Sequence, residues 1–221
     1  MVQSVNVGDT NVPTSPSARN IGVVFDSTLS MERHINTVCK TSYFHLKNIR
    51  AIRNLLTRAE TEKLVHAFVT SRLDLNNSLL YGIPQSILAP LQRVQNTAAR
   101  LITGALKYHH VTPVLQDLHW LPISYRVKYK IVLVVFKALN GLAPEYINDL
   151  VVLYKPVRTL RSSGDNLLRV PITKTNAGDR AFSGAAPSLW NKLPADIRHA
   201  LNLSSFKSKL KSYLFCEVFS V

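Results

Sequence analysis

The 221-residue chain carries 27 Lys and Arg residues against 13 Asp and Glu residues, which gives it a formal net charge of +14. Apolar residues make up 46% of the chain, a share that suits a folded globular protein and argues against wholesale disorder. The two cysteines cannot form a disulfide scaffold or a four-ligand zinc site. No apolar run approaches the length of a membrane span, and Met1 is followed by polar residues rather than by a signal peptide. The composition therefore predicts a basic intracellular protein, nuclear or cytoplasmic, with no membrane partner.

Residues 1–28 have the pattern of short β-strands. Valines punctuated by the turn signal Gly8-Asp9 predict a hairpin, and the apolar run from Ile21 to Phe25 predicts a further, buried strand. Gly22 within that strand indicates either a close backbone approach to a ligand or a simple bulge. The sequence pattern alone favours neither of these two interpretations of Gly22.

From Leu29 onward the apolar spacing becomes helical. Ser30 is expected to cap a first helix, whose apolar face would include Ile35, Val38, Leu46 and either Tyr43 or Phe44. A basic stripe is predicted on the opposite side, because cations recur there at seven-residue intervals with one more a turn further on: Arg33, Lys40, Lys47 and Arg50.

Two more helices follow in this segment. Thr57 and Glu60 have the spacing of a capping box that opens the second helix. The third ends at Gly104, a natural C-cap, and carries Arg93 and Arg100 on one face.

The rest of the chain is also predicted to be helical, with an irregular basic stretch. Thr112-Pro113 should start a short helix, Ser124 should open the longest helix and the core of the bundle, and Pro144 should start another short one. Residues 154–180 are expected to be irregular, with a strand at 167–172, and helices should close the chain at 185–193 and 204–215. Trp120 and Trp190 are expected to pack in the interior.

The predicted fold class is mainly α, with a short N-terminal β-hairpin and strand followed by a helical bundle and a helical, loop-rich C-terminal region. We divide the chain into strands at 1–28, a helical bundle at 29–105, a continuing helical core at 106–153, and a basic loop with C-terminal helices at 154–221.

The sequence contains few residue patterns that are typical of an active site. The acids are scattered, with no Asp-Asp or Asp-x-Asp pair, and no glycine-rich phosphate motif or nucleophile motif occurs. We predict no catalytic residue, no metal site, no cofactor and no small-molecule substrate. The positive charge favours a polyanionic partner, nucleic acid ahead of an acidic protein. Arg158 and Arg161 lie beside Tyr154 in a segment that could contact phosphates or simply form a solvated loop.

Long strings of the chain resemble a known family. They are NIGVVFDSTLSMERHI, HAFVTSRLDLNNSLLYGIP, LQRVQNTAARLITG, LHWLPISYRVKYKIVLVVFKALNGLAPEYINDL, GDRAFSGAAPSLWNKLPADIR and SFKSKLKSYLF. In colinear order they resemble the C-terminal part of the reverse transcriptase (RNA-directed DNA polymerase) encoded by LINE-type, non-LTR retrotransposons of the jockey-like kind.

The resemblance implies a truncated polymerase. Residues 1–28 would be the last strands of the palm, with Gly22 beside the primer terminus, and 29–105 would be the thumb, whose basic stripe would contact the template–primer backbone. The family uses Mg²⁺ at palm aspartates that would precede this chain. The chain alone is therefore expected to bind RNA, DNA or an RNA–DNA hybrid without polymerising. The alternatives are a helical protein-interaction module and a relic of a mobile element without function.

Overall fold

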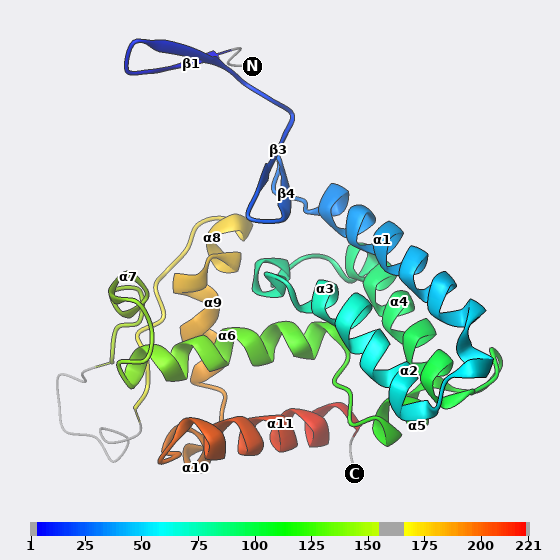
Figure 1. The fold of residues 1–221 in the computed structure, drawn as a ribbon. Helices are drawn as coiled ribbons and strands as arrows, with labels where there is room; N and C mark the ends of the chain where they lie inside the picture. Colours follow the sequence, from blue (N-terminus) through cyan, green and yellow to red (C-terminus); the bar gives the residue numbers. More distant parts are fainter. Residues whose placement is uncertain (1–3, 155–165, 220–221) are drawn as a thin grey trace.

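The structure is a computed structural model that describes residues 4–154 and 166–219. It is mainly helical, with a short region of β-strands at its N-terminal end, as the sequence predicts. Strands β1 (Ser4–Val7) and β2 (Thr10–Pro13) pair antiparallel around Gly8-Asp9, the predicted turn. In Figure 1 this hairpin stands away from the helices.

A second hairpin replaces the single buried strand expected at residues 21–25. Strands β3 (Ser17–Asn20) and β4 (Val23–Asp26) pair antiparallel, and Ile21 and Gly22 are the two residues of the turn. Both have positive φ, +46° and +80°, because a two-residue turn between twisted antiparallel strands needs this conformation. The placement of Gly22 inside a strand was therefore wrong. Ile21 is 81% exposed, and only β4 reaches the core, through Val23.

Helix α1 (Glu32–Ala51) begins one residue later than a Ser30 cap would place it, because its N-cap is Met31. The chain enters it through Asp26, whose carboxylate accepts hydrogen bonds from the backbone N–H groups of Ser30 and Met31, both at 2.8 Å. Ile35 and Leu46 are buried as expected, but Tyr43 and Phe44 are both exposed. Phe44 lies nine residues after Ile35, and at about 100° per residue this puts the two side chains on opposite sides of the helix.

The predicted capping box is confirmed at the start of α2 (Arg58–Val65). Thr57 Oγ1 accepts from the Glu60 N–H at 3.2 Å, and Glu60 Oε2 accepts from the Thr57 N–H at 2.7 Å. The helix continues through a π-helical turn, η2 (His66–Thr70), into α3 (Ser71–Asp74). A 3₁₀ turn, η3 (Asn77–Leu80), then leads to α4 (Gln85–Thr103), which packs along α1. Gly104 ends α4 with φ +73°, as predicted.

Helix α6 (Ile123–Leu139) lies at the centre of the molecule, as its apolar surface predicts. It follows α5 (Val111–Asp117) and contacts η3 and α4, which precede it, as well as helices of the C-terminal third. It is not the longest helix, since it has 17 residues against 20 in α1. Both helices begin earlier than predicted: α5 starts at Val111, ahead of Thr112-Pro113, and α6 starts at Ile123, one residue before Ser124. The carbonyl oxygen of Pro122 accepts the first backbone hydrogen bonds of α6.

The C-terminal third packs on α6 rather than forming a separate body (Figure 1). Its elements are α7 (Glu145–Asn148), α8 (Asn176–Arg180), α9 (Phe182–Trp190), α10 (Ala195–Arg198) and α11 (Leu203–Phe219). The strand expected at 167–172 is reduced to one bridge between Leu153 and Leu168. Trp120 and Trp190 are buried, as predicted. One hydrophobic cluster extends from Val23 to Leu214, so the segments 29–105, 106–153 and 154–221 share a core.

Candidate nucleic-acid interface

The predicted basic stripe lies on the solvent side of α1. Arg33, Lys40, Lys47 and Arg50 are all exposed, and Ile35 and Leu46 are buried on the side opposite Arg33, Lys40 and Lys47. Arg50 lies about 100° round the helix from Arg33, at the border with the buried side. None of the ion pairs found within residues 4–154 and 166–219 includes any of these four cations. Arg33 Nη1 donates to Ser17 Oγ at 3.0 Å, which joins the N-terminal end of the stripe to β3.

The two predicted arginines of α4 differ in their surroundings. Arg93 is exposed and lies close enough to α1 for its charge to act on Cys39, where burial raises the thiol pKa and Arg93 partly offsets that rise. Cys39 and Arg50 are eleven residues apart and therefore on nearly the same side of α1, so Arg93 borders the stripe at that side. We call Arg33, Lys40, Lys47, Arg50 and Arg93 the α1 basic face.

Arg100 forms a hydrogen bond with the loop that follows its own helix. It is half-buried, and its Nη2 donates to the carbonyl oxygen of His109 at 3.1 Å, in the loop that follows α4. The guanidinium therefore orders that loop, and we do not include Arg100 in the α1 basic face.

The remaining predicted contacts lie elsewhere. Gly22 is at the turn of the second hairpin, which rests against the segment after α3: Asn76 Nδ2 donates to the carbonyl oxygen of Ile21 at 3.1 Å. Arg158 and Arg161 lie outside the described residues. The ends of the basic loop are held together, because Tyr154 and Arg169 donate backbone hydrogen bonds to Leu167 and Val152, each at 2.8 Å.

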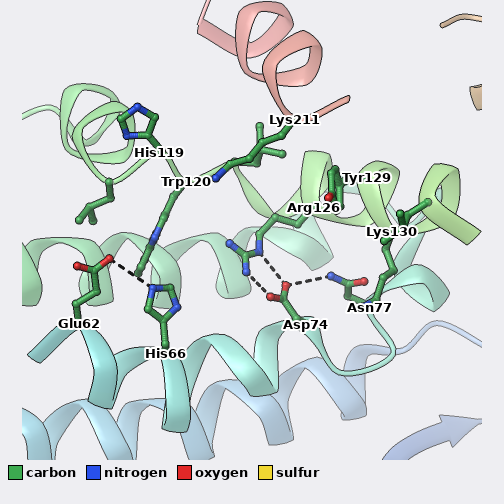
Figure 2. Close-up of a pocket in the computed structure, with 13 residues that line it drawn as sticks. Glu62, His66, Asp74, Asn77, His119, Trp120, Arg126, Tyr129, Lys130 and Lys211 are labelled. Carbon is green, nitrogen blue, oxygen red and sulfur yellow. Dashed lines mark hydrogen bonds and ion pairs between the residues drawn. The ribbon is translucent and has the colours of Figure 1, made fainter. Parts of the chain in front are cut away.

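A cavity of about 490 Å³ lies behind the α1–α4 layer and was not predicted. It is lined by α2, η2, α3 and η3 on one side and by the α5–α6 connection, α6 and α11 on the other (Figure 2). Arg126 crosses it to Asp74: Nε donates to Oδ1 at 2.8 Å and Nη2 pairs with Oδ2. Asn77 Nδ2 also donates to Asp74 Oδ1, at 3.2 Å.

The other end of the cavity carries aromatic and histidine side chains. His66 Nε2 lies 3.5 Å from Glu62 Oε1, and its ring meets the Trp120 ring edge to face at 5.5 Å. His119, with φ +52°, stacks on Phe215 at 5.8 Å. The acids of this cavity thus each have a basic partner, and Lys130 and Lys211 add positive charge at its wall. The arrangement links α3 to α6 and provides no set of carboxylates that converge on one point.

Within the described ranges, no group of three or more His, Cys, Asp and Glu side chains is placed to hold a metal ion. Among the helices that the structure describes, none has the length and apolar character needed to cross a membrane.

Comparison with known proteins gives no identification. No protein-family model matches the chain, and neither the curated proteins nor the solved structures contain a match. The family resemblance therefore depends on the sequence strings alone, and the functional argument depends on the α1 basic face.

Proposed function

We propose that this chain binds the phosphate backbone of RNA, DNA or an RNA–DNA hybrid through the α1 basic face, as the thumb-like part of a LINE-type reverse transcriptase. The observation that carries the proposal is the alignment of Arg33, Lys40 and Lys47 on the exposed side of one helix, outside every ion pair described. The net charge of +14 adds long-range attraction to any polyanion.

The dimensions of α1 suit a nucleic-acid backbone. From Arg33 to Arg50 the helix rises about 25 Å, which corresponds to roughly seven nucleotide steps of a B-form strand. Long Lys and Arg side chains on a rigid helix can follow phosphates over that distance. Contacts of this kind recognise the shape of the backbone rather than its sequence.

The proposal is limited to binding and includes no nucleotide addition by these residues. Three acids of the bundle already have partners in the fold: Glu60 caps α2, Glu62 faces His66, and Asp74 pairs with Arg126. In this reading residues 1–28 are the end of the palm, 29–105 are the thumb, and Gly22 lies at the edge that meets the primer.

A salt titration of binding tests the proposal. Fluorescence anisotropy would compare an RNA–DNA hybrid, duplex DNA and single-stranded RNA of equal length. We expect the hybrid to bind tightest, with an affinity that falls more than about 100-fold between about 50 and 200 mM salt if four or more phosphates are contacted. Absence of binding at about 50 mM salt, where phosphate contacts are strong, would contradict the proposal. If an acidic protein displaces the bound hybrid more effectively than bulk duplex does, the result would favour the protein-interaction alternative.

A further inference from the structure

An exposed phenylalanine lies in the middle of the α1 basic face. Phe44 is 61% exposed, and it projects opposite the buried side of α1. Lys40 is four residues before it and Lys47 is three residues after it, so both lysines are its neighbours on the helix surface. Phe44 therefore presents a large apolar ring between two cations of the α1 basic face.

Phe44 belongs to a row of three aromatic rings that crosses from α1 to η2. The Phe44 and His45 rings meet edge to face at 5.4 Å, and His45 stacks on Phe68 at 5.2 Å with an interplanar angle of 21°. Phe68 lies in the π-helical turn and is 43% exposed. Turns of this kind widen the helix locally and occur often at functional sites.

Within four residues of Phe44, His45 or Phe68 along the chain, the Lys, Arg, Asp and Glu residues are Lys40, Lys47 and Arg72, all of them cations. Burial lowers the pKa of His45 and the charge of Arg72 lowers it further, so at neutral pH His45 contributes a neutral ring. Glu32, at the far end, is the one acid of α1. On the neighbouring α2–α3 stretch, Glu60, Glu62 and Asp74 are all engaged in the cap and ion pairs described above.

A single-stranded nucleic acid has the chemistry that this surface would bind. Every nucleotide carries a flat ring that can stack on an aromatic side chain and a phosphate that can pair with a lysine. A purely apolar partner helix would cover the two phenylalanines but would also take Lys40, Lys47 and Arg72 out of water without compensation. The charges therefore favour a nucleic-acid strand.

We propose that Phe44, His45 and Phe68 form a stacking platform for one or two unpaired bases, beside phosphates held by Lys40 and Lys47. The inference rests on the proposed function and adds to it a preference: the α1 basic face would bind a duplex that carries a single-stranded extension better than the same duplex with blunt ends. Stacking of one base on such a surface corresponds to about a 5- to 150-fold gain in affinity.

The test uses the full chain and two hybrids that differ only in a short overhang labelled with 2-aminopurine, whose fluorescence is quenched on stacking. The variant Phe44→Ala with Phe68→Ala removes two exposed rings. Its matched control, Tyr108→Ala with Tyr146→Ala, removes two exposed rings in the loop after α4 and at α7. We expect the first variant to lose the overhang preference and the quenching while binding the blunt hybrid as the unaltered chain does, and the control to retain both.

The outcomes separate this inference from the proposed function. If the unaltered chain binds both hybrids equally with steep salt dependence and no quenching, the platform is wrong and the backbone contacts stand. If it binds neither hybrid, the proposed function fails as well. If the phenylalanine variant loses affinity for vesicles of anionic phospholipid but not for the overhang, the rings contact a lipid surface, which also overturns the inference.

Discussion

Arg126 on α6 and Asp74 at the end of α3 form a bidentate ion pair, although they are 52 residues apart in the sequence. Their side chains are 17% and 34% exposed, so the pair is largely withdrawn from water. It fixes the bundle of α1 to α4 against the central helix and closes one wall of the cavity in Figure 2.

Removing Arg126 should therefore destabilise the fold. We expect Arg126→Met to lower the free energy of unfolding by about 2 kcal/mol, because Asp74 is left partly buried without its main donor. Urea unfolding followed by circular dichroism measures the change. Arg58→Met is the matched control, since Arg58 and Asp117 pair at 2.5 Å with side chains that are 53% and 54% exposed. An exposed pair contributes at most about 1 kcal/mol, so equal losses in the two variants would contradict this account.

Asp26 predicts a pH dependence of stability. Partial burial raises its pKa, but the hydrogen bonds from Thr28, Ser30 and Met31 outweigh that effect and hold the pKa well below its usual range. A carboxyl with a lowered folded-state pKa stabilises the fold above its unfolded-state value of about 3.9, and the contribution disappears as the pH falls toward the folded-state value. Asp26→Asn should thus be less stable than the unaltered chain at about pH 7, and the difference should shrink below about pH 4. A difference that stays constant down to about pH 2 would show that charge at Asp26 is not responsible.

The turn at Gly22 predicts a conformational cost for a side chain there. Gly22→Ala should lose about 1 kcal/mol, because φ +80° is unfavourable for alanine. The added Cβ would lie 3.2 Å from Leu75 Cδ2, but Leu75 is exposed and can shift. Gly104→Ala has the same backbone cost, and its Cβ would meet no atom within 4 Å. The two variants should therefore lose similar stability, and Gly22→Asn should lose less, since asparagine tolerates positive φ.

Phe206 tests whether the C-terminal helices belong to one core. Its ring stacks on Phe136 of α6 at 4.0 Å and lies 5.9 Å from Trp190 of α9. We expect Phe206→Ala to cost about 3–5 kcal/mol and to shift a single cooperative transition. If residues 154–221 unfold first and the rest keeps its original midpoint, the shared core would be contradicted.

Features that depend on neighbouring residues were predictable from the sequence. The capping box of Thr57 and Glu60 and the C-cap at Gly104 are set by a few adjacent residues, and the structure contains both. The turn at Ile21-Gly22 was missed because it lies inside an apolar run, where the hydrophobic pattern gives no sign of a chain reversal. Either Tyr43 or Phe44 was assigned to the apolar face because apolar residues every three or four positions suggest one face. Both side chains are exposed, and the angle of Phe44 from Ile35 places it opposite.

Features that depend on distant residues could not be predicted. Nothing in the local sequence pairs Asp74 with Arg126, because both lie in segments where an isolated charge usually faces water. The row of Phe44, His45 and Phe68 depends on how α1 meets the π-helical turn. The basic stripe of α1, in contrast, could be predicted from the spacing of its cations along the helix, and these cations are exposed in the structure.

The measurement that tests the central claim most directly is the salt dependence of hybrid binding after neutralisation of the α1 basic face. Lys40→Gln, Lys47→Gln and Arg50→Gln would be combined in one variant and compared with Lys174→Gln, Lys192→Gln and Lys207→Gln, which remove the same charge from exposed positions outside α1. We expect the slope of log affinity against log salt to fall in magnitude by about 2–3 in the first variant and by less than about 1 in the control. Equal slopes in the two variants would mean that the positive charge acts without a defined surface, and the α1 basic face would not be the binding site.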